Sequence, residues 1–269
     1  MSNPYLNDRA MASAAKAGWA APDPGTMAGR NTPLTDGPVS SWRPRVMTVQ
    51  GTATATGVLL VLLLASATVG WMAAPTYDTG ETGFPALAIG GVIVGLICAI
   101  VVHFKPMWAR VLGPVYAVAE GFFLGVISKA YESYQDGVVV QAIGATVGVF
   151  AVMLFMYRTQ IIKVTDRFKR IVIGATLGLM AFYLVSFVIN IFGGDVSFFR
   201  STSWLGIGFS LFAAGLAALN LALDFDFIEK GSKAGMPKAM EWFAAFGLLI
   251  TLVWLYLELL RLLSKLNQR

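Results

Sequence analysis

Acidic side chains that interrupt long apolar runs are the residues of this chain whose type and spacing could support chemistry. The stretch from Leu219 to Lys230 places Asn220, Asp224 and Asp226 at the end of a run that is otherwise apolar enough to lie in lipid. A carboxylate near hydrocarbon must be neutralised, paired or hydrated, so it usually marks an ion path, a proton relay or a switch. We therefore interpret Asp224, with Asp226 beside it, as a gate or pH sensor. The alternative is that both aspartates terminate a helix at the lipid headgroups.

Glu120 is expected to be the most deeply placed acid. Counting about 1.5 Å per helical residue from Arg110, Glu120 lies about 15 Å into a hydrocarbon core roughly 30 Å thick. Gly121 and Gly125 follow it and would let another helix, or water, approach the carboxyl group. Two interpretations stand: a residue on an ion path, or a protonated glutamic acid that is hydrogen-bonded to a neighbouring helix.

Glu258 follows another long apolar run. It lies about 30 Å from Lys238 by the same count, which places it at the opposite membrane face. Arg261 and Lys265 recur at helical spacing on its side of the helix, so the sequence favours an ordinary interfacial ion pair three residues apart.

The composition sets the class of protein that must position these acids. A chain of 269 residues with 57% hydrophobic and 13% charged residues has more apolar surface than a water-soluble domain can bury. Its single cysteine, Cys98, and single histidine, His103, cannot form a disulfide framework or a histidine metal centre. We therefore expect a membrane protein with no cofactor and no tightly bound metal.

Seven apolar segments follow a proline-rich stretch over residues 1–46, which is predicted to be a disordered tail. Each segment approaches the roughly 20 residues that a helix needs to cross a bilayer. The prediction is an all-α membrane domain over residues 47–269, a bundle of seven transmembrane helices. The helices are expected at about 51–73, 84–104, 108–130, 138–157, 169–192, 203–228 and 239–263.

The basic residues predict orientation, because lysine and arginine are enriched on the cytoplasmic side. With the tail inside, fifteen of the 20 lysines and arginines lie on the inner side and five outside. They fall in short loops, so the net charge of +5 indicates topology and no nucleic-acid partner. We expect a cell-membrane protein with a cytoplasmic N-terminus and a C-terminus on the opposite side. A re-entrant last segment would instead return the C-terminus to the cytoplasm.

Three pairs of glycines have the spacing that lets membrane helices approach closely. These pairs are predicted to be packing surfaces of the bundle, and they are Gly91 and Gly95, Gly144 and Gly148, and Gly174 and Gly178.

Three stretches together resemble one family. Leu223 to Lys230 is similar to the Tyr/Phe-Asp-x-x-x-Ile motif of the Bax inhibitor-1 family, and Glu120 to Gly125 resembles its Glu-Gly segment in the third helix. The helix ending in Leu-Glu-Leu-Leu-Arg-Leu-Leu is similar to the family's closing helix. The likeness follows the order of the segments over about residues 48–263.

The resemblance implies a seven-helix fold with the last helix central, and a pH-sensitive calcium leak governed by aspartates in helices six and seven. Asp224 matches the first aspartate. Alignment on the end of the last helix puts Thr251 where the second is expected, with Glu258 two turns further on. The remaining acidic candidates for a partner of Asp224 are Glu120, Asp226 and Glu241.

Calcium and protons are the partners that this chemistry favours, beside the lipid bilayer itself. Calcium prefers several oxygen ligands, and a path that binds it transiently at Asp224 and Glu120 could pass it down a gradient. Two carboxylates in contact cannot both ionise easily, so such a pair titrates as a unit and changes the charge at the gate.

Other functions use the same features differently. A proton-coupled secondary transporter would use the same acids, while a membrane interaction protein that regulates a protease or a stress response would depend on the tail or loops. A retinal receptor is excluded, because the last segment has lysines only at its ends, Lys238 and Lys265. No hydrolase motif such as GxSxG or HExxH occurs, so we do not expect an enzyme.

Overall fold

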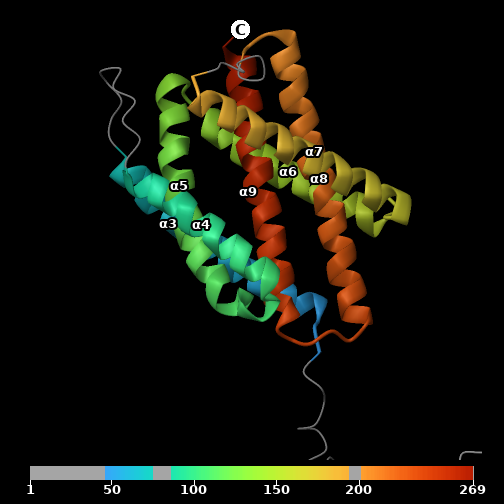
Figure 1. Ribbon diagram of the computed structural model, residues 1–269. Coiled ribbons are helices and arrows are strands. Elements are labelled where there is room, and N and C mark those ends of the chain that lie inside the picture. Colours follow the sequence, from blue (N-terminus) through green and yellow to red (C-terminus); the bar gives the residue numbers. More distant parts are fainter. Residues whose placement is uncertain (1–45, 75–85, 194–200, 269) are drawn as a thin grey trace, which may run out of the picture. The chain divides into compact units, whose positions relative to one another are not determined.

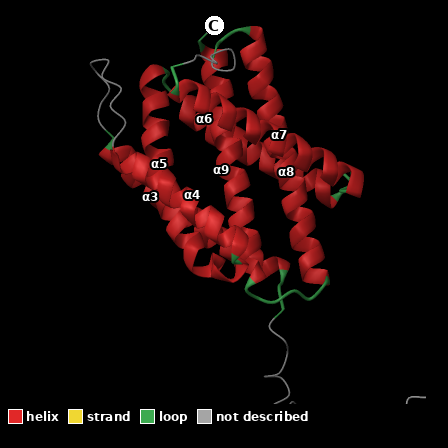
Figure 2. Cartoon of the chain, viewed as in Figure 1, coloured by secondary structure: helices red, strands yellow, loops and turns green. Residues whose placement is uncertain are grey.

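The protein is described here from a computed structural model that covers residues 46–74, 86–193 and 201–268. These residues form helices joined by short loops, with no strand of a sheet among them (Figure 2). Nearly all of the tail predicted over residues 1–46 lies outside the described residues. The helices are α3 (Val49–Ala73), α4 (Ala86–Phe104), α5 (Ala109–Tyr134), α6 (Val138–Arg158), α7 (Asp166–Ile191), α8 (Trp204–Lys233) and α9 (Met240–Asn267), with a 3-10 turn, η2 (Pro106–Trp108).

The predicted fold class, a bundle of seven membrane helices, is confirmed. Six of the described helices, all except α4, are long and apolar enough to cross a membrane, and α4 has a shorter apolar stretch, Ala88–Phe104. Helices suit this environment because they satisfy every internal backbone hydrogen bond without water. The chain is therefore a multi-pass membrane protein.

Local side-chain chemistry sets where several helices begin. Thr48 and Thr165 cap α3 and α7, each accepting a hydrogen bond from a backbone N–H three residues on, at 2.9 and 3.2 Å. Ser203 caps α8 in the same way. Such caps satisfy amide groups that the first turn of a helix leaves without a partner. Gly137, with φ of 81°, makes the turn before α6.

Helix α9 is the centre of the bundle, as predicted (Figure 1). It contacts α3, α5, α6 and α8. Within its most apolar stretch 61% of the residues are buried, compared with 17% in α7, which has α8 as its main neighbour. Residues on α9 therefore meet side chains from most of the other helices, whereas α7 lies at the edge.

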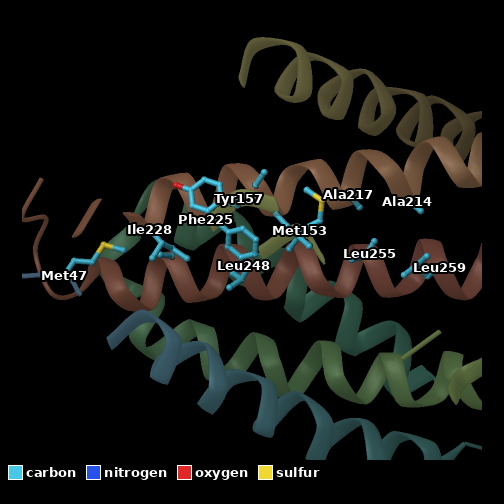
Figure 3. Packing of buried hydrophobic residues seen from close by; sticks show 13 residues of the cluster. Met47, Met153, Tyr157, Ala214, Ala217, Phe225, Ile228, Leu248, Leu255 and Leu259 are labelled. Carbon is cyan, nitrogen blue, oxygen red and sulfur yellow. The ribbon is translucent and has the colours of Figure 1, made fainter. Parts of the chain in front are cut away.

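One buried apolar cluster joins α8 and α9, with contributions from α6 (Figure 3). Phe225 and Ile228 of α8 pack in it with Leu248 of α9, and Ala214 and Ala217 continue it along α8. A second cluster joins α9 to α3, α4 and α5. The two clusters hold α9 from opposite sides.

Helix α8 is longer than predicted: it ends at Lys233, whereas the sequence predicted an end near residue 228. Two ion pairs at helical spacing, Asp226 with Lys230 and Glu229 with Lys233, support this polar last turn. Asp224 is nine residues before the helix end, or about 13 Å along its axis at 1.5 Å per residue. The interpretation that Asp224 and Asp226 terminate the helix is wrong.

The glycine pairs divide into two groups. Gly91 and Gly95 face α5 closely: a Cβ atom added to Gly91 would lie 2.7 Å from the Ala119 carbonyl oxygen. By contrast, Cβ atoms added to both pairs on α6 and α7 would meet nothing within 4 Å in the described part of the chain. The prediction that those two pairs pack within the bundle is wrong. A close approach of helix backbones instead uses Gly121 and Gly125, which lie against the backbone of α3.

Candidate functional site

Asp224 lies at the interface of α8 with α9, several turns inside the helix. Its Oδ1 atom would be 4.0 Å from a Cβ atom built on Gly247, and the carboxyl group interacts with the Thr251 side chain one turn further along α9. Its Oδ2 atom is buried and has no hydrogen-bond partner among the described residues. A buried oxygen without a donor is rare in proteins and unfavourable for an ionised carboxylate. The geometry suits a group that takes up a proton or a cation.

Thr251 is the residue that the structure brings to Asp224, as its alignment with the family's second aspartate implies. It is buried, and its hydroxyl donates to the Gly247 carbonyl oxygen at 3.2 Å. A hydroxyl does not titrate in the physiological range, so this pair contains one titratable group in place of two. The site therefore lacks the coupled titration of two carboxylates.

Asp226 occupies a different environment, although it is only two residues away. Its side chain is almost fully buried and accepts from the ammonium groups of Lys169, at 2.6 Å, and Lys230, at 2.9 Å. Since Lys169 belongs to α7, this contact ties α7 to α8. In this arrangement Asp226 is charge-neutralised, whereas Asp224 is not. Lys169 was missed as a partner because nothing in its sequence position points to α8.

A second contact lies next to this one, at the same end of α8. The Tyr157 hydroxyl donates to Glu229 at 2.5 Å, and Lys233 forms an ion pair with the same carboxylate. Tyr157 is on α6, so α6, α7 and α8 are joined here by charged and polar groups.

Glu120 is half-buried on α5 and faces α4. Its Oε2 atom would lie 2.7 Å from a Cβ atom on Gly95, and the Tyr116 side chain is close enough to interact electrostatically. In the described residues no hydrogen bond or ion pair joins Glu120 to Asp224. The hydrogen bond to another helix that its structural interpretation requires is likewise not seen there. The two acids belong to separate interfaces of the bundle.

Glu241 contacts the start of α3 and not Asp224. It is buried at the start of α9 and accepts hydrogen bonds from the Thr48 backbone N–H at 3.0 Å and from the Thr48 hydroxyl at 2.9 Å. A carboxylate at a helix N-terminus also interacts favourably with the helix dipole. Glu241 therefore anchors the start of α3, and its carboxylate contacts Thr48, not Asp224.

Glu258 forms the predicted ion pair with Arg261, but the expectation of an ordinary interfacial pair is wrong. The Glu258 side chain is only 2% exposed, and it lies 2.9 Å from the guanidinium group. The hydroxyl of Tyr183, on α7, also donates to it at 2.8 Å, and the Trp254 indole donates at 3.3 Å. A carboxylate this deeply buried needs such partners, because burial removes its hydration.

Lys265, predicted on the same side of the helix as Glu258, also forms hydrogen bonds with α8. Its buried ammonium group donates to the Gly206 carbonyl oxygen at 2.9 Å and to the Ser210 hydroxyl at 2.8 Å. Glu258, Arg261 and Lys265 thus hold α7 and α8 to the C-terminal half of α9. The sequence alone suggested surface residues, because charged groups near a helix end are usually solvated.

The described fold and these acids define a multi-pass helical membrane protein with carboxylates placed inside the bundle. The family model described as Bax inhibitor 1 like matches residues 3–268. The chain belongs to this family, as the motifs at Glu120 and Asp224 indicated. No curated protein matches the chain.

Proposed function

We propose that the protein is a pH-sensitive leak for calcium ions, and that Asp224 is the group whose protonation controls it. The observation that carries this proposal is the buried Oδ2 atom of Asp224, which has no hydrogen-bond partner in the described residues. In the ionised state this oxygen requires a counter-charge; in the protonated state it requires none. Proton and calcium therefore compete for the same oxygen. The proposed function requires no enzymatic step and no cofactor.

Calcium binding at this position would be weak and transient. One carboxylate and one hydroxyl, from Asp224 and Thr251, supply fewer than the six to eight oxygens that calcium prefers, so water must supply the rest. Within the described residues, no group of three acids, histidines or cysteines comes together to hold a metal ion. Weak binding suits conduction, because a permeating ion must also leave.

The interface of α8 with α9 beyond Asp224 supplies the barrier in this account. Leu221, Ala217 and Leu255 are buried in the cluster that joins the two helices (Figure 3). A dry apolar segment blocks an ion because the ion cannot keep its hydration there. We propose that a change of charge at Asp224 alters how tightly α8 and α9 pack across this segment.

The direct experiment measures calcium entry into liposomes that contain the purified full-length protein, at an acidic and a neutral pH. We expect entry that depends on both the protein and the pH. Absence of protein-dependent flux at every pH would contradict the proposal. Uphill movement of calcium driven by a proton gradient would instead identify a coupled transporter.

Glu120 gives the first prediction. If its carboxylate lies on the ion path, Glu120→Gln should lower the calcium flux while leaving the protein folded, because glutamine keeps the shape and removes the charge. The measurement is flux per inserted protein, with folding followed by circular dichroism. Gly95, which faces Glu120, has no side chain, so the substitution removes no side-chain hydrogen bond to this neighbour. Unchanged flux at every pH would assign Glu120 a structural role.

Topology gives the second prediction, and it concerns the cell membrane as the proposed location. The tail and the basic loop that contains Lys163 should be cytoplasmic, because basic loops remain inside. The test is labelling of single cysteines in intact cells after Cys98→Ser. Lys163→Cys should resist an impermeant reagent and react after permeabilisation. Labelling of Lys163→Cys in intact cells would contradict the orientation.

A second candidate function is a membrane interaction protein that regulates a protease or a stress response. The observation in its favour is the pair of open glycine faces on α6 and α7, since such faces suit association of helices in lipid. This function would survive the loss of Asp224. Normal regulation together with abolished flux in an Asp224 variant would favour it over the leak.

A further inference from the structure

A lateral apolar groove lies between α3 and α6, with α5 and α9 forming its floor. Its volume is about 500 Å³, within the range of roughly 300–1,000 Å³ that is typical of small-molecule sites. Leu64 of α3 and Val147 of α6 are exposed at its rims. The groove therefore opens sideways, toward the hydrocarbon that surrounds a membrane helix.

The lining excludes charged ligands and disfavours water. None of the residues that line the groove is charged. The hydroxyl groups of Thr56, Thr68 and Thr146 each donate to a carbonyl oxygen of their own helix, at 2.9, 2.9 and 2.7 Å. Apolar cavities stay dry unless polar partners can hold a water molecule. An empty groove would lose dispersion contacts along its walls, so a flexible apolar chain is the occupant that fits.

One end of the groove is polar in a way that suits a lipid ester. The hydroxyl groups of Ser128 and Tyr256 are 2.6 Å apart, and either can be the donor. Two hydroxyl groups carry two protons and use one between them, so one O–H has no acceptor among the residues that the structure describes and can donate to a ligand. Trp71 lines the same end, and tryptophan and tyrosine are enriched where a membrane meets water.

A cation lies immediately beyond that end. Lys129, the residue after Ser128, donates its ammonium group to the Ala74 carbonyl oxygen at 2.7 Å. It forms no ion pair with any residue that the structure describes. An ammonium group with spare donors beside an interfacial hydroxyl pair complements a phosphate.

The groove is long enough for a chain that enters from one leaflet. Thr56 and Trp71, at its two ends on α3, are fifteen residues apart, or about 22 Å along a helix. This exceeds the roughly 15 Å depth of one leaflet, half of a 30 Å core. We propose that the groove binds one acyl chain of a glycerophospholipid, whose ester meets the Ser128 and Tyr256 hydroxyls and whose phosphate pairs with Lys129.

Photo-crosslinking tests this proposal without reference to calcium flux. The full chain is reconstituted in phosphatidylcholine liposomes that contain a phosphatidylcholine with a diazirine in one acyl chain, and labelled peptides are located by mass spectrometry. We expect labels to concentrate on the groove residues of α3 and α6. Exposed positions on the outer side of α7, such as Leu184 and Phe187, supply the background level.

Filling the groove should abolish this enrichment. Thr146→Phe places a ring inside it, and Val147→Phe narrows its exposed rim with less risk to folding. Val152→Phe is the matched control, because Val152 is an exposed residue of α6 that does not line the groove. Labelling should fall to background in the first two variants and remain unchanged in the third. Uniform labelling of the lipid-facing surface, or equal labelling in all three variants, would overturn the proposal.

The phosphate contact has its own test. Lys129→Gln should lower labelling by the phospholipid probe about threefold, as expected for one partly exposed charge pair, without affecting a diazirine fatty alcohol. Preferential labelling by the fatty alcohol in the unaltered protein would show that the groove does not select a phospholipid. If a higher density of the protein in the liposomes lowers the labelling of the groove, a second copy of the chain is its occupant. That result would also overturn the proposal.

Discussion

Glu258→Ala should lower the free energy of unfolding by about 2–3 kcal/mol, less than the roughly 3–5 kcal/mol for breaking a fully buried ion pair, because the Arg261 side chain is partly exposed. The carboxylate is 2% exposed and holds Arg261 at 2.9 Å, while Tyr183 donates to the same group. Its loss would leave the guanidinium group of Arg261, whose side chain is 32% exposed, without its counter-charge. The measurement is a denaturant titration of the purified protein in detergent, followed by tryptophan fluorescence.

Two controls separate this pair from charge loss in general. Lys233→Ala breaks an exposed ion pair with Glu229 and should change the unfolding free energy little, because solvent screens such pairs. The double variant Glu258→Leu with Arg261→Leu should be more stable than Glu258→Ala, since no unpaired charge remains. A loss in Glu258→Ala no larger than in Lys233→Ala would show that the Glu258 carboxylate is not buried as described.

The helices and the central position of α9 could be predicted, because membrane helices are defined by long apolar segments and the closing helix matched a family pattern. The end of α8 could not. Hydropathy falls at Asp224, whereas the helix continues through polar residues that pair with one another as far as Lys233. Hydropathy reports where lipid ends, not where backbone hydrogen bonding ends.

The partners of the acids were the least predictable part of the site. Glu241 binds Thr48, which is 193 residues away in the chain, and Asp226 binds Lys169 of α7. Such pairings depend on which helices are neighbours and on how each is rotated, and one sequence contains neither. The match of Asp224 with Thr251 was predictable only because the resemblance aligned two helices at once.

The packing of the glycine pairs could also be predicted only in part. The spacing at Gly91 and Gly95 is identical to that at Gly174 and Gly178, yet only the first pair faces a neighbouring helix in the described residues. Spacing predicts a surface that permits close approach. It does not say whether the approach is to the same chain, to another protein or to lipid.

Asp224→Asn should flatten the pH dependence of calcium flux. An amide has nearly the shape of a carboxyl group but takes up no proton in this range, so conformations of the protein can no longer differ in proton binding at this residue. Folding and insertion should survive, because the amide removes a charge that the interface of α8 with α9 leaves without a donor at Oδ2. The expected change is in how the flux depends on pH, whether or not the size of the flux also changes.

Asp136→Asn is the matched control for this substitution. Asp136 is exposed in the turn between α5 and α6, so the same chemical change there should leave the profile as it is. Thr251→Val adds a second comparison: it removes the hydroxyl beside Asp224 but keeps the carboxylate. We expect the Thr251 variant to retain a pH response with a displaced midpoint, since the titrating group is still present.

Calcium entry into liposomes, recorded from about pH 5.5 to 8 where a functional sensor must titrate, tests the central claim most directly. The unaltered protein and Asp224→Asn are compared at equal insertion. The account predicts a pH-dependent flux for the unaltered protein and a flat profile for the variant. Profiles with the same shape and midpoint in both proteins would contradict it, because Asp224 would then not be the group that senses pH.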